Sequence, residues 1–185
     1  MLVQTTAATI RNFGSTSRAY SRAALPEDQL ESLAVIIGRR LSLYMDAHLS
    51  SLAEENGIPL MDFKALAYIV EFQSLPTGQL VRLMGLSPGG TTALINRLEA
   101  GGFITRDRDK YDRRVVALKP IAERCAGLVF SGDGLARHIA AASEFCDEPG
   151  LEGIRDFLTC FLNGLKVDTQ SWLMTATKEG SAQAV

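Results

Sequence analysis

The chain is poor in the residues that build catalytic and metal centres. Among its 185 residues only two are histidine, His48 and His138, and three are cysteine, Cys125, Cys146 and Cys160. The cysteines lie far apart and form no C-x-x-C pair, and no nucleophile, acid cluster or glycine-rich phosphate loop falls at a motif spacing. We therefore expect neither an enzyme nor a metal protein, and no cofactor.

Long hydrophobic runs are lacking as well. No stretch reaches the roughly 20 consecutive apolar residues that a membrane-spanning helix needs. Unpaired cysteines in a chain without a signal peptide are typical of a reducing compartment, so we expect a cytoplasmic protein. A hydrophobic content of 46% over 185 residues is enough for one domain with a proper core.

What the chain does contain is a pair of short helical patterns joined by a tight turn. The first pattern begins at Thr77, which we expect to act as its N-cap, and ends before Gly85, with Leu80, Leu83 and Met84 facing inward. The second begins with Ser87 as cap and Pro88 at the first helical position, and ends at Gly101-Gly102. Its inner face carries Leu94, Ile95 and Leu98, and its other face carries Thr91, Thr92, Asn96 and Arg97.

Two glycines, Gly89 and Gly90, occupy the first turn of the second pattern. A helix start without side chains lets its backbone amides and the positive end of its dipole approach a phosphate or a base edge. Glycine is also inexpensive in a first turn, so by themselves these two residues leave both interpretations open.

A basic hairpin follows the helix pair. Residues 103–108 and 115–118 alternate as two strands around the polar tip 109–114. From Ser74 to Lys119 there are eight basic and four acidic residues, a local charge of +4 in a chain whose total is −2. Positive charge beside a helix-turn-helix is the electrostatic footprint of phosphate binding.

At these residues the sequence resembles the MarR family of winged-helix transcriptional regulators, from about Pro26 to about Trp172. Residues 86–99 are similar to the family's recognition helix, and Asp112-Arg113-Arg114 followed by Val116 and Leu118 is similar to its D-x-R wing signature. One departure is Lys119-Pro120, where the family commonly has a threonine that caps the next helix.

The resemblance implies a set of DNA contacts. The first residues of the second helix would face the major groove, Asn96 and Arg97 would lie nearer the DNA backbone, and Arg114 would enter the minor groove, oriented by Asp112. The candidate DNA-binding residues are Thr77, Gln79, Ser87, Pro88, Gly89, Gly90, Thr91, Thr92, Asn96, Arg97, Arg106, Arg108, Asp112, Arg113 and Arg114.

The expected fold is mainly α with a small β-wing, a winged helix-turn-helix plus a helical dimerisation region. A long helical pattern from Pro26 to Asn56 and another from Leu151 to Leu165 both carry wide apolar faces. In the family such helices form a two-fold dimer, although they could also close the core of a monomer. The expected segments are an N-terminal arm (1–24), an N-terminal dimerisation helix (25–57), the winged domain (58–119), C-terminal dimerisation helices (120–174) and a tail (175–185).

The arm is basic, and its composition is that of an organellar transit peptide, but a flexible arm fits better with a regulator that looks bacterial. A helix break is expected at Ser131-Gly132-Asp133-Gly134. Family members often bind a small, frequently aromatic effector, for which Tyr44, His48 and Phe63 are the candidates, although His48 fits a core position as well.

The sequence thus predicts a homodimeric, sequence-specific regulator that binds a near-palindromic double-stranded DNA site, and we expect a repressor that a small ligand releases. The alternative is a winged-helix protein-interaction module that has lost operator recognition, because one fold can host unrelated functions.

Overall fold

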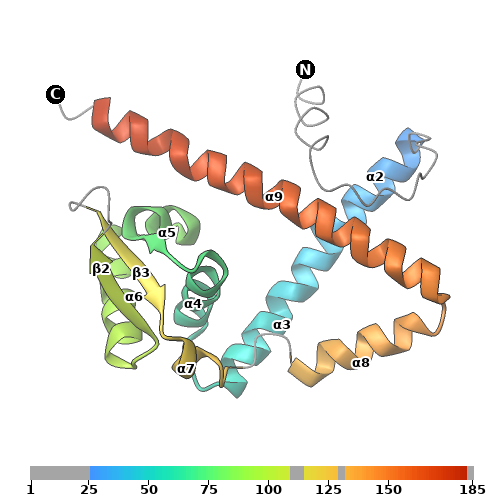
Figure 1. Cartoon of the computed structure of the whole chain (residues 1–185), viewed down its shortest axis with the longest axis horizontal. Coiled ribbons are helices and arrows are strands. Elements are labelled where there is room, and N and C mark those ends of the chain that lie inside the picture. Colours follow the sequence, from blue (N-terminus) through green and yellow to red (C-terminus); the bar gives the residue numbers. More distant parts are fainter. Residues whose placement is uncertain (1–25, 109–114, 129–131, 183–185) are drawn as a thin grey trace. The chain divides into compact units, whose positions relative to one another are not determined.

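The computed structural model describes residues 26–108, 115–128 and 132–182 (Figure 1). The chain divides into two compact units. One comprises the chain up to Arg40 together with the segment from Glu148 onward, and the other comprises Leu41–Asp147. The candidate arm, residues 1–24, lies outside the described residues.

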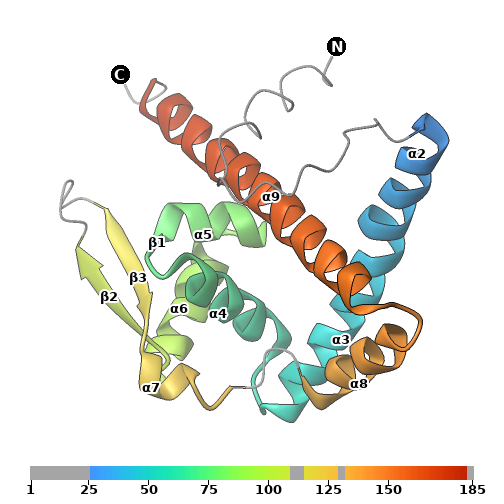
Figure 2. The same ribbon diagram turned by 45° about the vertical axis from the view of Figure 1, so that its right-hand side comes forward.

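The larger unit contains a winged helix-turn-helix, which confirms the expected fold class. Its elements are α3 (Ser42–Glu55), α4 (Leu60–Phe72), β1 (Leu75–Pro76), α5 (Thr77–Met84), α6 (Pro88–Ala100), β2 (Ile104–Arg108), β3 (Val116–Pro120), α7 (Ala122–Cys125) and α8 (Gly132–Ser143). The three strands form an antiparallel sheet in the order β1-β3-β2, and β2 and β3 form its longer ribbon (Figure 2).

The core of this unit lies between α4, α5, α6 and the sheet. Its buried members come from every one of these elements: Ala65, Leu66, Ile69, Leu75, Leu80, Leu94, Ile95, Leu98, Ile104 and Leu118. Apolar residues on these short elements are spaced to face one another, and their burial supplies most of the stability of so small a sheet. A separate small cluster of Leu52, Ala53 and Phe63 joins α3 to α4.

Local signals set several helix ends as the sequence predicts. Gly85 ends α5 in the left-handed region at φ 62°, and Gly102 follows α6 at φ 71°, a backbone geometry that glycine adopts without strain. Gln73 ends α4 with φ 60°, where glycine is the usual residue.

The expected cap of α5 is wrong. Thr77 is the first residue of the helix and makes no capping hydrogen bond; its hydroxyl instead donates to the carbonyl oxygen of Val116, at 3.0 Å. This bond ties α5 to β3 near the point where β1 pairs with the same strand. The two-residue strand β1 was not expected, and β3 continues through Lys119-Pro120 rather than ending at Leu118.

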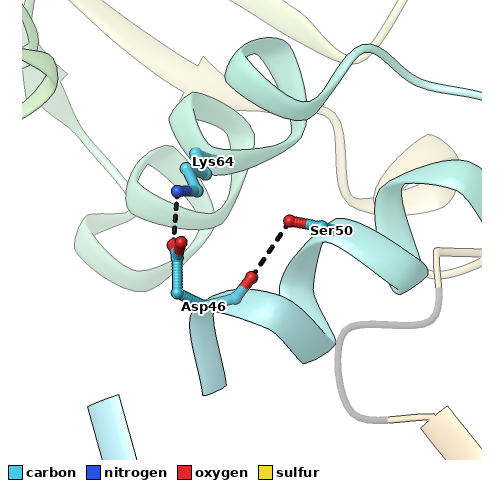
Figure 3. Close-up of polar contacts among 3 residues, drawn as sticks. All are labelled: Asp46, Ser50 and Lys64. Atoms are coloured by element: carbon cyan, nitrogen blue, oxygen red, sulfur yellow. Dashed lines mark hydrogen bonds and ion pairs between the residues drawn. The ribbon is translucent and has the colours of Figure 1, made fainter. Parts of the chain in front are cut away.

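An ion pair also joins α3 to α4. The Lys64 ammonium donates to the Asp46 carboxylate, and one turn later the Ser50 hydroxyl donates to the backbone oxygen of Asp46, at 3.1 Å (Figure 3). Both acid and hydroxyl lie near the surface, so this pair adds little to stability compared with the apolar cluster beside it.

After the sheet the chain forms two further helices. The Cys125 thiol, at the end of α7, lies in the core and donates to the backbone oxygen of Phe103, and burial raises the pKa of this thiol. Helix α8 begins at Gly132, so the glycine-rich segment marks the start of a helix. This agrees with the expected break between two helical segments.

In the described residues, the smaller unit is made of helices. It contains α2 (Glu27–Val35), most of a π-helical segment at Ile36–Leu41, and α9 (Glu148–Ala182). The π-helical segment interrupts what the sequence predicts as one continuous helix, and α9 runs on through most of the expected tail. In the described part of the chain, no helix combines the length and the apolar character needed to cross a membrane.

Many large apolar side chains of these helices are exposed in the single chain. On α9 they include Leu151, Ile154, Phe157, Leu158, Leu162 and Leu165, and Phe157 stacks on Phe161 with ring centroids 6.1 Å apart. An apolar stripe of this extent is typical of a surface that packs against another chain.

We predict that Leu118→Ala lowers the free energy of unfolding by about 2–5 kcal/mol, because it opens a cavity in the centre of the core. Urea unfolding followed by circular dichroism measures this. Val116→Ala on the same strand is the control, since Val116 is exposed and its truncation should change stability by less than about 1 kcal/mol. Equal losses in the two variants would contradict the assigned core.

Candidate nucleic-acid interface

Helix α6 begins at an exposed and well-capped N-terminus. The hydroxyl oxygen of Ser87 accepts from the backbone N–H of Gly90 at 3.2 Å, and Pro88 occupies the first helical position, as the sequence predicts. Ser87, Pro88, Gly89 and Gly90 are all exposed. Backbone N–H groups in this turn, together with the helix dipole, make the end of α6 a favourable place for an anion.

The two glycines of this turn differ in what surrounds them. A Cβ on Gly90 would lie 3.3 Å from the Ser87 hydroxyl oxygen, so a side chain here would crowd the cap. A Cβ on Gly89 would meet no atom within 4 Å. Packing within the chain therefore favours glycine at position 90 and has no bearing on position 89.

Thr91 differs from the sequence-based expectation. The sequence predicts Thr91 on the outer polar face, but the residue is 1% exposed, and its hydroxyl donates to the backbone oxygen of Ser87 at 3.1 Å. Thr91 lies one helical turn before the buried Leu94 and Ile95, so it shares their face. Thr92 is exposed, and its hydroxyl donates to the backbone oxygen of Pro88 at 2.8 Å.

The exposed face of α6 is linked to the wing through Arg106 on β2. The guanidinium of Arg106 donates to the Asn96 side-chain oxygen and forms an ion pair with Glu99, with Nε and Oε2 3.1 Å apart. Asn96 and Glu99 both lie on α6, so this arginine joins the helix to the first strand of the wing. Sequence reasoning missed Glu99, although an acid three residues after Asn96 on a helix shares its face.

Arg97, near the end of α6, pairs with an acid on another helix. Its Nε donates to Asp62 Oδ2 at 2.8 Å and its Nη2 donates to Oδ1 at 2.6 Å. The hydrogen bonds to Asp62 raise the pKa of the Arg97 guanidinium above its ordinary value. Asp62 was also missed from the sequence; the signal was an acid at the start of a mostly apolar helix, directly before Phe63.

The remaining candidates spread over the wing and the first helix of the pair. Arg108, at the end of β2, is exposed, and Lys119 on β3 pairs with Asp107 at 2.6 Å. Gln79 and Thr77 are half-buried on α5. Asp112, Arg113 and Arg114 lie outside the described residues.

The three candidate effector contacts have different environments. Phe63 is fully buried in the small cluster with Leu52 and Ala53, Tyr44 is exposed, and His48 is half-buried. A Cβ on Gly134 of α8 would lie 4.0 Å from the His48 ring. In the part of the chain that the structure describes, no group of histidine, cysteine or acidic side chains could hold a metal ion.

Comparison with known proteins matches a MarR family sequence model to residues 56–115, from the end of α3 to the start of β3. An uncharacterized HTH-type transcriptional regulator of Bacillus subtilis (strain 168), YcgE, is 33% identical over 93 residues. This alignment covers 50% of the present chain and 60% of the relative's length.

Solved structures show the same fold. A MarR family protein from Bacillus stearothermophilus has a TM-score of 0.57 at 20% identity, over 77% of this chain and 99% of the other. RV1404 from Mycobacterium tuberculosis has a TM-score of 0.50 at 20% identity, over 76% of this chain and 95% of the other.

We predict that Ser87→Ala lowers the free energy of unfolding by about 1 kcal/mol, because the Gly90 amide loses its acceptor at the start of α6. Chemical denaturation measures this loss. Ser87→Asn, which keeps an acceptor at the cap, should retain nearly all of the stability. If the asparagine variant were as unstable as the alanine variant, the cap would not be the cause.

Proposed function

Because residues 56–115 match the MarR family, we propose that this chain is a dimeric, sequence-specific DNA-binding regulator of transcription. The observation that carries the proposal is the exposed first turn of α6, on a helix whose exposed face is joined further along to β2 through Arg106, with Arg108 exposed on the same strand. A helix of this kind fits the major groove of DNA, and an arginine-bearing ribbon beside it fits the flanking phosphates.

The proposed contacts divide into two kinds. Ser87, Gly89, Gly90 and Thr92 on the exposed N-terminal part of α6 would lie at base edges, where hydrogen bonds carry sequence preference. Arg106, Arg108 and Arg113 would bind phosphates, and Arg114 would enter the minor groove; Arg113 and Arg114 lie outside the described residues. Phosphate contacts supply most of the affinity and make it depend on salt.

The proposed dimer rests on the exposed apolar stripe of α9. In the single chain these residues are 39–59% exposed, so each lacks roughly half of the about 1.5–3 kcal/mol that full burial of a large apolar side chain contributes. A second copy of the chain would cover them and would bring two α6 helices about one DNA turn apart. A near-palindromic site is the expected partner of such a symmetric pair.

We further propose a repressor that a small ligand, such as an aromatic compound, releases from DNA. A ligand that binds better to one separation of the two α6 helices would shift the population toward that state. A ligand with equal affinity for both states would leave DNA binding unchanged.

The direct test is selection of bound fragments from a random DNA pool, followed by titration of the enriched duplex at several salt concentrations. Enrichment of an inverted repeat with half-sites about one helical turn apart is the expected result. If no sequence is enriched, the proposed function is wrong, and the interaction-module alternative takes its place.

We predict that Arg108→Ala weakens binding to all duplexes to a similar extent and reduces the slope of log K against log salt by about one. Fluorescence anisotropy at four salt concentrations measures both quantities. Arg137→Ala is the control, because this exposed arginine lies on α8 and its loss changes the net charge equally. Identical slopes for the two variants would show that only net charge matters.

We also predict that Leu162→Glu converts the protein to a monomer, since it places a charge in the apolar stripe of α9. Leu162 is 59% exposed in the single chain, so the fold of one chain should tolerate the change. Analytical ultracentrifugation gives the mass, with Gln170→Glu at an exposed position of the same helix as the control. A dimeric Leu162→Glu variant would place the interface elsewhere.

A further inference from the structure

Asp62 is a charged side chain inside the winged-helix unit. The whole residue is 2% exposed, and a carboxylate at such depth is strongly destabilising unless a cation and hydrogen bonds compensate it. Both of its oxygens accept from the same guanidinium, Oδ2 from Nε and Oδ1 from Nη2 of Arg97, at 2.8 and 2.6 Å. Such a two-point pair fixes the plane and direction of the arginine head.

The positions of the two residues in their helices reinforce the pair. Asp62 lies in the first turn of α4 and Arg97 in the last turn of α6. A negative charge near a helix N-terminus and a positive charge near a C-terminus are both stabilised by the helix dipole. The pair therefore joins two complementary helix ends, and it holds α6 against the central helix of the core.

The pair with Asp62 uses only some of the N–H donors of Arg97. A guanidinium has five N–H donors, and Asp62 takes two of them, which leaves both donors of Nη1 and one of Nη2. The Arg97 side chain is 56% exposed, whereas the Asp62 side chain is 4% exposed. The acid therefore holds the arginine from the protein side, while part of the cation stays accessible to solvent.

We propose that Asp62 is a positioning residue for DNA binding: it holds Arg97 so that the remaining Nη1 and Nη2 donors receive one backbone phosphate. The inference rests on the proposed function and extends it to a residue that itself never touches DNA. An arginine held in advance loses less conformational freedom when the phosphate arrives, so the contact is stronger than one made by an unrestrained side chain.

Positioning and net charge predict opposite effects of Asp62→Asn on the affinity for DNA. Asp62→Asn removes a negative charge, which through long-range electrostatics alone would strengthen binding to DNA. An asparagine side chain in this place cannot accept from both guanidinium nitrogens, since one of its two terminal groups is a donor. Loss of positioning would instead weaken binding, and we expect a loss of about tenfold, the scale of one charge-assisted hydrogen bond.

The experiment measures affinity for the selected duplex in wild type, Asp62→Asn, Arg97→Ala and the double variant. Thermal unfolding of each variant sets a temperature at which all are folded. We expect Asp62→Asn to weaken binding in the wild-type background and to leave affinity unchanged or slightly higher in the Arg97→Ala background. Equal effects in both backgrounds would overturn the inference.

A second readout separates positioning from a general loss of structure. Duplexes in which single phosphates are replaced by neutral methylphosphonates locate the phosphate that wild type needs and Arg97→Ala does not. We expect Asp62→Asn to lose sensitivity at that same phosphate and to keep it at the others. If Asp62→Asn keeps full sensitivity there, Asp62 does not position the contact.

Asp46→Asn is the matched control. Asp46 also pairs with a basic side chain, Lys64, but it lies on α3 and is exposed, so its loss should leave affinity unchanged or slightly higher. Failure of wild type to select any DNA would overturn the proposed function and this inference together. Selective binding by wild type with an unaltered Asp62→Asn variant would overturn this inference alone.

Discussion

The burial of α4 is the constraint on which the winged-helix unit depends. This helix is apolar on several sides: Ala65, Leu66 and Ile69 enter the main core, while Phe63 packs against α3. Apolar side chains on different sides of one helix must each be covered by a neighbouring element. The elements that cover it include α6 and β3, the same elements that form the candidate interface and its wing. The inner face of α6 packs on α4, and this packing leaves the opposite face of α6 exposed to solvent. The Asp62–Arg97 pair joins the two helices at one end of this contact.

Local chemistry explains which parts of the fold could be predicted. The start of α6 follows from Ser87 and Pro88, and the end of α5 from Gly85, because caps act within a few residues. Strand β1 was missed because two residues carry no periodicity, and it forms only by pairing Leu75 with Leu118, far along the chain. The same holds for Thr77, whose hydroxyl bonds to a strand 39 residues away instead of capping its own helix.

The candidate site was predicted in outline and corrected in detail. The burial of Thr91 was within reach of the sequence, since it precedes Leu94 and Ile95 by three and four residues. The partner of Arg97 was not, because Asp62 lies 35 residues earlier and nothing local relates the two. In the described residues Arg97, Arg106 and Lys119 each pair with an acid. Each pairing holds the basic group in a defined position. Arginines held in this way favour defined contacts over diffuse attraction to polyanions.

Gly89 illustrates how the demands of folding and of binding diverge at one residue. Alanine would fit there without touching another atom, and helix propensity favours alanine by up to about 1 kcal/mol. Gly89→Ala is therefore an obvious candidate for a thermostable variant, since no contact within the chain opposes the change. On the proposed function the added methyl group would stand between α6 and the floor of the groove. Selection for heat tolerance would then favour alanine at position 89, whereas selection for operator binding would favour glycine.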